Sequence, residues 1–461
     1  MKKVITRFAP SPTGTLHIGG VRTALFNYVF SKQNNGLFLI RIEDTDKERS
    51  KKEYEKNILD SLISIGLKPD KDPINQSNRT DIYKAAAQKI FDSGNAYYCN
   101  CSIDRLDELR NEQQAKGIKP GYDGKCRNLN LTNNGNCVLR LKTPQNGELI
   151  MRDYVRGEIR FDNKELDDLI ILRSDGTPTY HLCNVVDDYE QEVTTVIRGE
   201  DHISNTPRQI HIQNALGYPS LEYAHLPLVL GPDKKRLSKR HAATSLAEYR
   251  QEGYLDDAIL NTLARLGWSK GDNEVFTLED LIRDFDINEI QKAGAVFDKS
   301  KLDYLNVQHL AKLSTDDFKK TIQPFLIDVD IDINSHPQPD KLINAMRTSG
   351  NTLLEIALSM NPYFKNIEKY DEKAIGKFIK DKNILIDLIK IIEKQEIWDE
   401  ESLDIMLQDF QSSKNLNIPQ VNQPIRIALT GSTRSPSLGL TMSLFSKNEV
   451  LTRINDLLKF I

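Results

Sequence analysis

The sequence predicts a multidomain α/β protein in which a parallel-sheet domain is split by an α+β insertion and followed by an all-helical C-terminal half. Three observations lead to this prediction. Strand and helix patterns alternate up to about residue 82, they resume near Thr177 after a stretch of different texture, and helical spacing prevails beyond Thr244. A chain of 461 residues has room for about three domains.

The N-terminal segment has the order strand, helix, strand, helix. A short strand over residues 4–9 ends at the proline-rich segment 10–14, and a helix over 17–32 ends before Gly36. The apolar run 37–42 reads as a buried strand, and the next helix, centred on Ile58 and Leu62, ends at Gly66. A βαβα order of this kind is typical of a parallel sheet.

The rest of the chain divides according to its pattern of predicted strands and helices. Residues 83–174 contain hairpin-like strands such as 137–141 and are predicted to be the insertion, while strands at 195–198 and 224–230 continue the parallel sheet. Helices follow, with breaks near 334–339 and 415–424. The predicted domains are therefore 1–82 with 175–240, 83–174, 241–325, and 326–461, the last with a further division near 398.

Composition and charge exclude several classes of protein. Hydrophobic residues make up 39% and charged residues 28% of the chain, so it is neither disordered nor fibrous. The net charge of −4 argues against a surface that binds nucleic acid everywhere. The charge is uneven, however: residues 1–50 carry eight basic and four acidic residues, and residues 201–250 carry seven and four. There is no signal peptide and no apolar run long enough to cross a bilayer, so no membrane association is expected.

A glycine-rich segment lies at the first strand-to-helix junction. Gly14 and Gly19 have the spacing of a P-loop, but Gly20 and Val21 stand where that motif needs Lys and Ser or Thr, so a P-loop is excluded. What remains is His17 beside two glycines, where a helix N-terminus favours phosphate. The alternative is an ordinary tight turn with a surface histidine.

A cationic segment follows the strand at 224–230. Five of the seven residues 234–240 are basic, and they come directly after the turn signal 231–233. A loop of this kind at the edge of a sheet could stabilise charge on a transferring phosphate. The alternative is a solvated basic face.

These segments resemble a known family. Residues 17–20 (His-Ile-Gly-Gly) and 236–240 (Arg-Leu-Ser-Lys-Arg) look like the two signatures of class I aminoacyl-tRNA synthetases. Segments 7–14, 41–46 and 180–188 are similar to bacterial-type glutamyl-tRNA synthetases. The resemblance extends over the whole chain and is densest in residues 4–47 and 177–245.

The resemblance implies a fold and a reaction. The split domain would be a Rossmann-like catalytic domain, 83–174 would bind the tRNA acceptor end, 241–325 would contact the stem, and 326–461 would bind the anticodon. The enzyme would be a cytoplasmic, monomeric ligase that uses ATP and Mg²⁺ to activate L-glutamate as glutamyl-adenylate. It would then transfer the glutamyl group to the 3′-terminal adenosine of tRNA(Glu).

The resemblance also implies site residues. The candidate catalytic residues are His17 and Lys239. Those implied to bind ATP are His17, Gly19, Gly20, Arg236, Leu237, Ser238 and Lys239. Those implied to bind glutamate are Arg7, Ala9, Ser11, Glu43, Tyr180, Asn184 and Arg198. Arginine suits a substrate with two carboxylates because its planar fork binds each of them through two hydrogen bonds. The sequence departs from the usual signatures at Gly20, which fits the glutamyl branch but removes one phosphate donor seen elsewhere in the class. It departs also at Arg236 and Ala242, and neither of these changes looks disabling.

The five cysteines are sparse and odd in number, which indicates a reduced, cytoplasmic protein. Cys99, Cys101 and Cys126 match three ligands of a zinc site found in some members of the family. The expected fourth position is Asn128, a poor zinc ligand, and Tyr122 or Cys137 would need unusual geometry. The alternative is a set of packed thiols.

Three other functions compete with aminoacylation. They are glutamylation of a modified tRNA base, nucleotidyl transfer by a related fold, and a non-catalytic tRNA-binding paralogue. Joint retention of His17, Glu43, Arg198 and Lys239 argues against the last of these. In the C-terminal half, Arg426, Arg434 and residues 430–433 are candidates for contact with RNA, and scattered surface arginines are the alternative.

Overall fold

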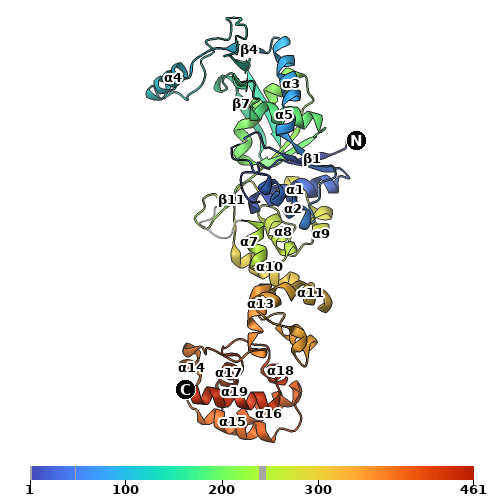
Figure 1. Ribbon diagram of the computed structural model, residues 1–461, viewed down its shortest axis with the longest axis vertical. Coiled ribbons are helices and arrows are strands. Elements are labelled where there is room, and N and C mark those ends of the chain that lie inside the picture. Colours follow the sequence, from blue (N-terminus) through green and yellow to red (C-terminus); the bar gives the residue numbers. More distant parts are fainter. Residues whose placement is uncertain (1–2, 47, 238–244) are drawn as a thin grey trace. The chain divides into compact units, whose positions relative to one another are not determined.

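The structure is a computed structural model that describes residues 3–46, 48–237 and 245–461 (Figure 1). The chain forms two compact units. The first consists of Met1–Glu248 with Leu260–Asp298, and the second of Tyr249–Ile259 with Lys299–Ile461. Among the described residues, no helix combines the length and the apolar character needed to span a membrane. The finer domain boundaries inside the two units stay a prediction.

The N-terminal βαβα order is confirmed. The elements are β1 (Ile5–Phe8), α1 (Ile18–Gln33), β2 (Leu37–Ile42), α2 (Lys52–Ser64) and β3 (Ile74–Asn75). Strands β1 and β2 run parallel, and so do β2 and β3. Between α1 and β2 the chain passes so close to β1 that a Cβ atom at Gly36 would lie 2.0 Å from the carbonyl oxygen of Val4. Only glycine fits this approach without displacement of the backbone.

The second half of the parallel sheet follows after the insertion. Its elements are α5 (Tyr180–Glu190), β9 (Thr195–Gly199), α6 (Thr206–Leu216), β10 (Glu222–Leu226) and β11 (Val229–Leu230). The Thr194 backbone N–H, just before β9, donates to the carbonyl oxygen of Ile5, so β9 begins beside β1. The single strand predicted over 224–230 is wrong: it is divided at Pro227, which cannot donate a hydrogen bond to a neighbouring strand.

The segment 83–174 contributes to two sheets. Its elements, with the helix that leads into it, are α3 (Thr80–Asp92), β4 (Ala96–Cys99), α4 (Ile103–Ala115), β5 (Val138–Leu141), β6 (Glu148–Asp153), β7 (Gly157–Asp162) and β8 (Ile170–Leu172). Strands β4, β5 and β8 form an antiparallel sheet. Strands β7 and β6 instead extend the sheet of β10 and β9, in the order β7-β6-β10-β9. The segment is therefore joined to the parallel-sheet region by strand pairing.

The remainder is helical, as predicted, apart from the short strand β12 (Ala295–Val296), which pairs with β11. The helices are α7 (Leu246–Gln251), α8 (Asp256–Arg265), α9 (Leu278–Asp284), α10 (Lys299–Lys312), α11 (Thr315–Asp328), α12 (Pro339–Met346), α13 (Leu353–Ser359), α14 (Glu372–Phe378), α15 (Asn383–Lys394), α16 (Glu400–Lys414), α17 (Ile418–Thr430), α18 (Leu438–Ser443) and α19 (Lys447–Phe460). In the second unit, α19 packs against α15 and α17 (Figure 1).

One predicted break in the helical half is shorter than expected. The break over 415–424 ends at Asn417, whose side chain caps α17, and Pro424 lies inside that helix. A proline removes the hydrogen bond to the carbonyl four residues earlier. Here that residue is Gln420, which is exposed in the first turn, so the loss is tolerated.

Candidate active site

A cavity of about 570 Å³ opens beside the first turn of α1 and the carboxyl ends of β1 and β9. It collects sequence-predicted residues from six separate segments of the chain. Those that line it are Arg7, Ala9, His17, Gly19, Gly20, Glu43, Tyr180, Asn184, Arg198, Arg236 and Leu237. Ser11 is exposed and does not line this cavity. Ser238 and Lys239 lie outside the described residues.

A buried ion cluster holds the arginine at the end of β1. The Asp188 carboxylate accepts hydrogen bonds from Arg7 Nε at 2.9 Å and from Arg41 Nη1 at 2.7 Å. Arg7 is 3% exposed and Arg41 is fully buried, so both guanidinium groups depend on this carboxylate. Burial opposes ionisation of Asp188, but Arg41 and Arg7 outweigh it and lower the pKa of Asp188.

Glu43 presents a carboxylate to the cavity from the end of β2. Its Oε1 atom accepts a hydrogen bond from Asn184 Nδ2 at 2.8 Å and lies 3.8 Å from Arg41 Nη2. Burial raises the pKa of Glu43, although Arg41 and Arg7 act in the opposite direction. A ligand cation placed beside Glu43 would favour the ionised carboxylate. Asn184 and Tyr180 are one turn apart on α5, which brings both side chains to the same wall.

Arg198 projects from β9 and is 6% exposed. Its Nε–H donates to His225 Nε2 at 3.2 Å, and its Nη2 donates to Thr206 Oγ1 at 2.8 Å. Within the described part of the chain, Arg198 makes no ion pair with a carboxylate. Burial lowers the pKa of Arg198, while Tyr180 and Asp188 act in the opposite direction.

His17 is the N-cap residue of α1. Its Nδ1 accepts a hydrogen bond from the Gly19 backbone N–H at 3.0 Å. A neutral imidazole that accepts at Nδ1 carries its proton on Nε2, so we assign this tautomer from the hydrogen bond. Burial, assisted by the charge of Arg236, lowers the pKa of His17. The first turn of α1 contains no acidic residue.

The chain turns back tightly at the start of the cationic segment. Gly231 N–H donates to Lys235 O at 2.7 Å, and Leu237 N–H donates to Val229 O at 2.9 Å. Arg236 is consequently carried back to the cavity, where its Nη1 lies 3.3 Å from Asp201 Oδ2. The predicted position of this segment beside the sheet edge therefore holds as far as Leu237.

Sequence reasoning missed several residues of this site. Arg22 on α1 is buried against the cavity and donates to the carbonyl oxygen of Pro227 at 2.6 Å. His202 lies 3.3 Å from the Tyr180 hydroxyl, and burial together with Arg198 lowers its pKa to about 4. Arg41 carried a signal that was available: a charged residue inside the apolar run 37–42 indicates a buried ion pair.

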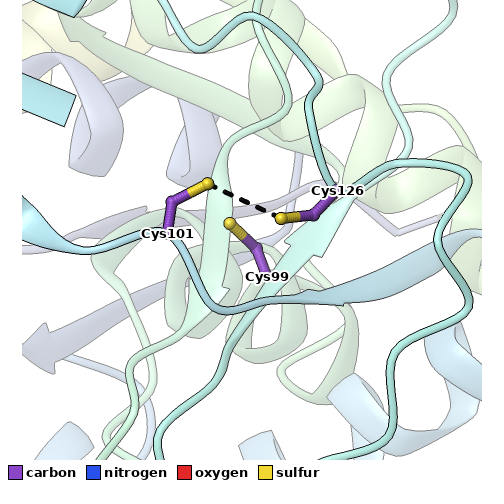
Figure 2. A group of neighbouring side chains, drawn as sticks. All are labelled: Cys99, Cys101 and Cys126. Carbon is purple, nitrogen blue, oxygen red and sulfur yellow. Dashed lines mark hydrogen bonds between the residues drawn. The ribbon is translucent and has the colours of Figure 1, made fainter. Parts of the chain in front are cut away.

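The three predicted cysteine ligands lie together (Figure 2). Ligand atoms of Cys99, Cys101 and Cys126 are all within 4.8 Å of one another. The Tyr122 hydroxyl is 3.3 Å from Cys99 Sγ and 3.8 Å from Cys101 Sγ. Burial opposes the Cys99 thiolate, but hydrogen bonds from Tyr122, the Cys101 backbone and Arg140 lower the pKa of Cys99 to about 7.

The structure distinguishes between the three candidates for the fourth zinc ligand. Asn128 is exposed. Cys137 Sγ points elsewhere, toward Asn134 Oδ1 at 3.3 Å. Tyr122 is the candidate that lies against the thiols, and the guanidinium carbon of Arg140 sits 3.8 Å from the centre of its ring.

Comparison with known families defines the class of this protein. The family described as "tRNA synthetases class I (E and Q), catalytic domain" matches residues 3–304, and an "Anticodon binding domain" matches residues 287–458. The class is therefore that of the class I tRNA synthetases.

Individual relatives agree over their full length. The chain is 42% identical in sequence to "Glutamate--tRNA ligase 2" of Halorhodospira halophila, and the alignment covers 100% of this chain and 99% of that protein. The corresponding ligase of Thermodesulfovibrio yellowstonii is 43% identical, with 98% of each chain covered. A crystal structure of a glutamate tRNA ligase from Elizabethkingia meningosepticum, in complex with its amino acid, superposes with a TM-score of 0.88 at 32% identity, with 99% of each chain covered. The chain belongs to the glutamate–tRNA ligase family.

Proposed function

We propose that this chain is a glutamate–tRNA ligase that activates glutamate with ATP and transfers it to tRNA. The observation that carries the proposal is the cavity in which Arg7, Glu43 and Arg198 surround one space next to His17. Two cations and one anion there complement a substrate with two carboxylates and one ammonium group. The full-length relatives named as glutamate–tRNA ligases support the same reaction.

Arg198 is assigned to the side-chain carboxylate of glutamate. It is a buried cation whose bonds within the protein go to neutral groups, so a substrate carboxylate would supply the missing counter-charge. Arg7, which lines the same cavity and is held by Asp188, is assigned to the other carboxylate of glutamate. Glu43 is assigned to the ammonium group, with Asn184 fixing the orientation of its carboxylate.

The first chemical step is an in-line displacement at the α-phosphorus of ATP. A carboxylate oxygen of glutamate forms the new bond to phosphorus, while the bond to the bridging oxygen breaks and pyrophosphate leaves with that electron pair. His17 is assigned to donate its Nε2–H to a phosphate oxygen, because Nδ1 is already occupied by Gly19. The N-terminus of α1 adds a favourable dipole. Mg²⁺ would accompany the phosphates, and Lys239 is assigned to the leaving group by resemblance.

The second step transfers the glutamyl group to tRNA. The hydroxyl oxygen of the terminal adenosine attacks the adenylate carbonyl, AMP leaves with the electron pair of the broken bond, and the hydroxyl proton passes to the departing phosphate. In the helical half, Arg426 donates to Ser435 Oγ at 2.7 Å and to Pro436 O at 3.1 Å, so it orders the loop that carries the exposed Arg434. We assign Arg434, rather than Arg426, to direct contact with RNA.

Aminoacylation tests the proposal. Purified protein, ATP and labelled glutamate should charge tRNA(Glu), and glutamine should not replace glutamate. Periodate oxidation of the terminal ribose should abolish charging, because the product is an ester at the 3′ end. Incorporation that survives periodate would instead indicate glutamylation of a base, and complete inactivity would indicate a non-catalytic paralogue.

Matched arginine variants locate the site. Arg198→Ala should raise the glutamate KM sharply, because it removes a charged, two-bond contact with the side-chain carboxylate. Arg160→Ala is the control, since Arg160 forms exposed ion pairs with Glu148 and Glu158 on β6 and β7. Its kinetic constants should equal those of the parent. An unchanged glutamate KM in Arg198→Ala would remove Arg198 from the pocket.

We also propose that Cys99, Cys101 and Cys126 hold a structural zinc ion with Tyr122 as the fourth ligand. The three thiols lie within 4.8 Å of one another and are ligands that Zn²⁺ prefers, and the Tyr122 hydroxyl stands next to two of them, which supports it as the fourth group. Zinc would fix the loop between β4 and β5. Metal analysis of purified protein should find one zinc per chain, and Cys126→Ser should lose it. A zinc-free parent protein would leave packed thiols as the explanation.

A further inference from the structure

Three adjacent strands align a row of polar side chains behind Arg198. In the order β6-β10-β9, Asp153 ends β6, His225 lies on β10, and Arg198 is the register partner of His225 on β9. Asp153 is 5% exposed and His225 is fully buried. Buried polar groups of this kind persist only when hydrogen bonds satisfy them. The contacts below account for each member of the row.

Asp153 determines which nitrogen of His225 carries the proton. Its Oδ1 accepts from the backbone N–H groups of Val155 at 2.9 Å and Arg156 at 2.8 Å. Its Oδ2 accepts from the His225 backbone N–H at 3.0 Å and lies 2.6 Å from His225 Nδ1. Since both carboxylate oxygens already accept from fixed backbone donors, Nδ1 must be a donor as well. The proton of the neutral imidazole therefore resides on Nδ1.

His225 Nε2 is consequently a hydrogen-bond acceptor, and it faces Arg198 Nε at 3.2 Å. Thr206 Oγ1 accepts from Arg198 Nη2 at 2.8 Å and stands 3.1 Å from His225 Nε2. These bonds occupy the Nε–H and one N–H of Nη2. The edge formed by Nη1 and the second N–H of Nη2 stays available to a carboxylate in the cavity.

The imidazole separates Asp153 from Arg198. A carboxylate in direct contact would occupy a two-bond edge of the guanidinium and neutralise its charge. A neutral acceptor instead fixes the guanidinium plane through Nε and leaves the charge for the substrate. The anion of Asp153 remains one ring away, on the far side of the imidazole.

We propose that Asp153 and His225 are positioning residues that orient Arg198 for the side-chain carboxylate of glutamate, so that they set amino-acid affinity without touching the substrate. This inference rests on the proposed function. Burial lowers the pKa of His225, in line with a neutral ring.

Paired substitutions at His225 separate orientation of Arg198 from general packing. In His225→Asn the amide reaches the Nδ1 position but offers no acceptor at Nε2, so the glutamate KM should rise on the order of tenfold, as expected for one lost hydrogen bond to a charged group. In His225→Gln the amide oxygen reaches the Nε2 position and should restore much of the affinity. The ATP KM should stay at the parent value in both variants.

A matched control is available at His211. It is also buried, and its Nε2 lies 3.0 Å from Asn163 Oδ1, outside the residues that line the cavity. His211→Asn should keep the parent glutamate KM. If His225→Asn has the parent glutamate KM, or if the ATP and glutamate KM values rise together, the proposal is overturned.

A measurement on the unmodified protein covers the case in which the variants fail to fold. Nitrogen-15 NMR of histidine-labelled full-length protein at neutral pH should find that His225 carries its proton on Nδ1 and that Nε2 is unprotonated. A proton on Nε2 would overturn the proposal, because two donors would then face each other. Failure of the wild-type protein to charge tRNA(Glu) would count against the proposed function, whereas parent kinetics in His225→Asn beside an active wild type would count only against the positioning role.

Discussion

Asp188→Asn is expected to destabilise the first compact unit strongly. The substitution keeps the size of the side chain but removes the charge that Arg7 and Arg41 share, and it turns an N–H₂ group toward one of them. Two guanidinium groups would each lose a charged hydrogen bond, at about 1.5–3 kcal/mol apiece. Together the two losses come to about 3–6 kcal/mol, in line with the loss of about 3–5 kcal/mol expected when a buried ion pair is broken by removal of one partner.

Urea unfolding followed by circular dichroism measures the loss, and its pH dependence gives a second test. The folded-state pKa of Asp188 is lowered, so its stabilising contribution is complete above the unfolded value of about 3.9 and disappears as pH falls through the folded value. The gap between wild type and variant should therefore shrink on acidification. The control is Asp284→Asn, where Lys270 and Arg283 also share one carboxylate but are largely exposed. It should keep the parent midpoint. Equal midpoints for all three proteins would refute the reasoning.

Three further outcomes are expected. Lys239→Ala should lower adenylate formation by orders of magnitude with near-parent tRNA affinity, and parent turnover would contradict the role assigned to the cationic segment. Glu43→Gln keeps an acceptor for Asn184 but loses the charge, so the glutamate KM should rise without loss of thermal stability; an unchanged KM would remove Glu43 from the pocket. Gly36→Ala should cost roughly 1–3 kcal/mol in urea unfolding because its methyl group meets a backbone carbonyl, whereas Gly376→Ala, in open space on α14, should be neutral or stabilising, and equal effects would contradict the steric argument.

Much of the fold could be predicted because its signals are local. The βαβα start follows from apolar periodicity punctuated by Gly36 and Gly66, and the helical half follows from repeated 3.6-residue spacing. The strand predicted over 224–230 failed at Pro227, because one apolar run can supply two short strands. The pairing of β6 with β10 could not be predicted either, because strands that are distant in sequence leave no local pattern when they pair.

The candidate site could also be predicted only in part from the sequence. Residues carried by continuous motifs, such as His17, Glu43 and Asn184, were predicted, as was Arg198 from the wider resemblance, and the structure brings them to one cavity. Ser11 was predicted with them but is exposed. Asp153 and His225 were missed, because neither lies in a motif and their role depends on a sheet register that only the structure reveals.

The pairing of β6 with β10 bears on how this chain can be re-engineered. A segment that interrupts a domain invites excision or exchange with a counterpart from another protein. Here a chimera cut at 83 and 174 would strip one edge of β10 and discard Asp153 with it. A graft would work only if the incoming segment brought a strand of matching register that ended in an aspartate. Through β6, the segment therefore supplies both a strand of the sheet and the aspartate that contacts His225.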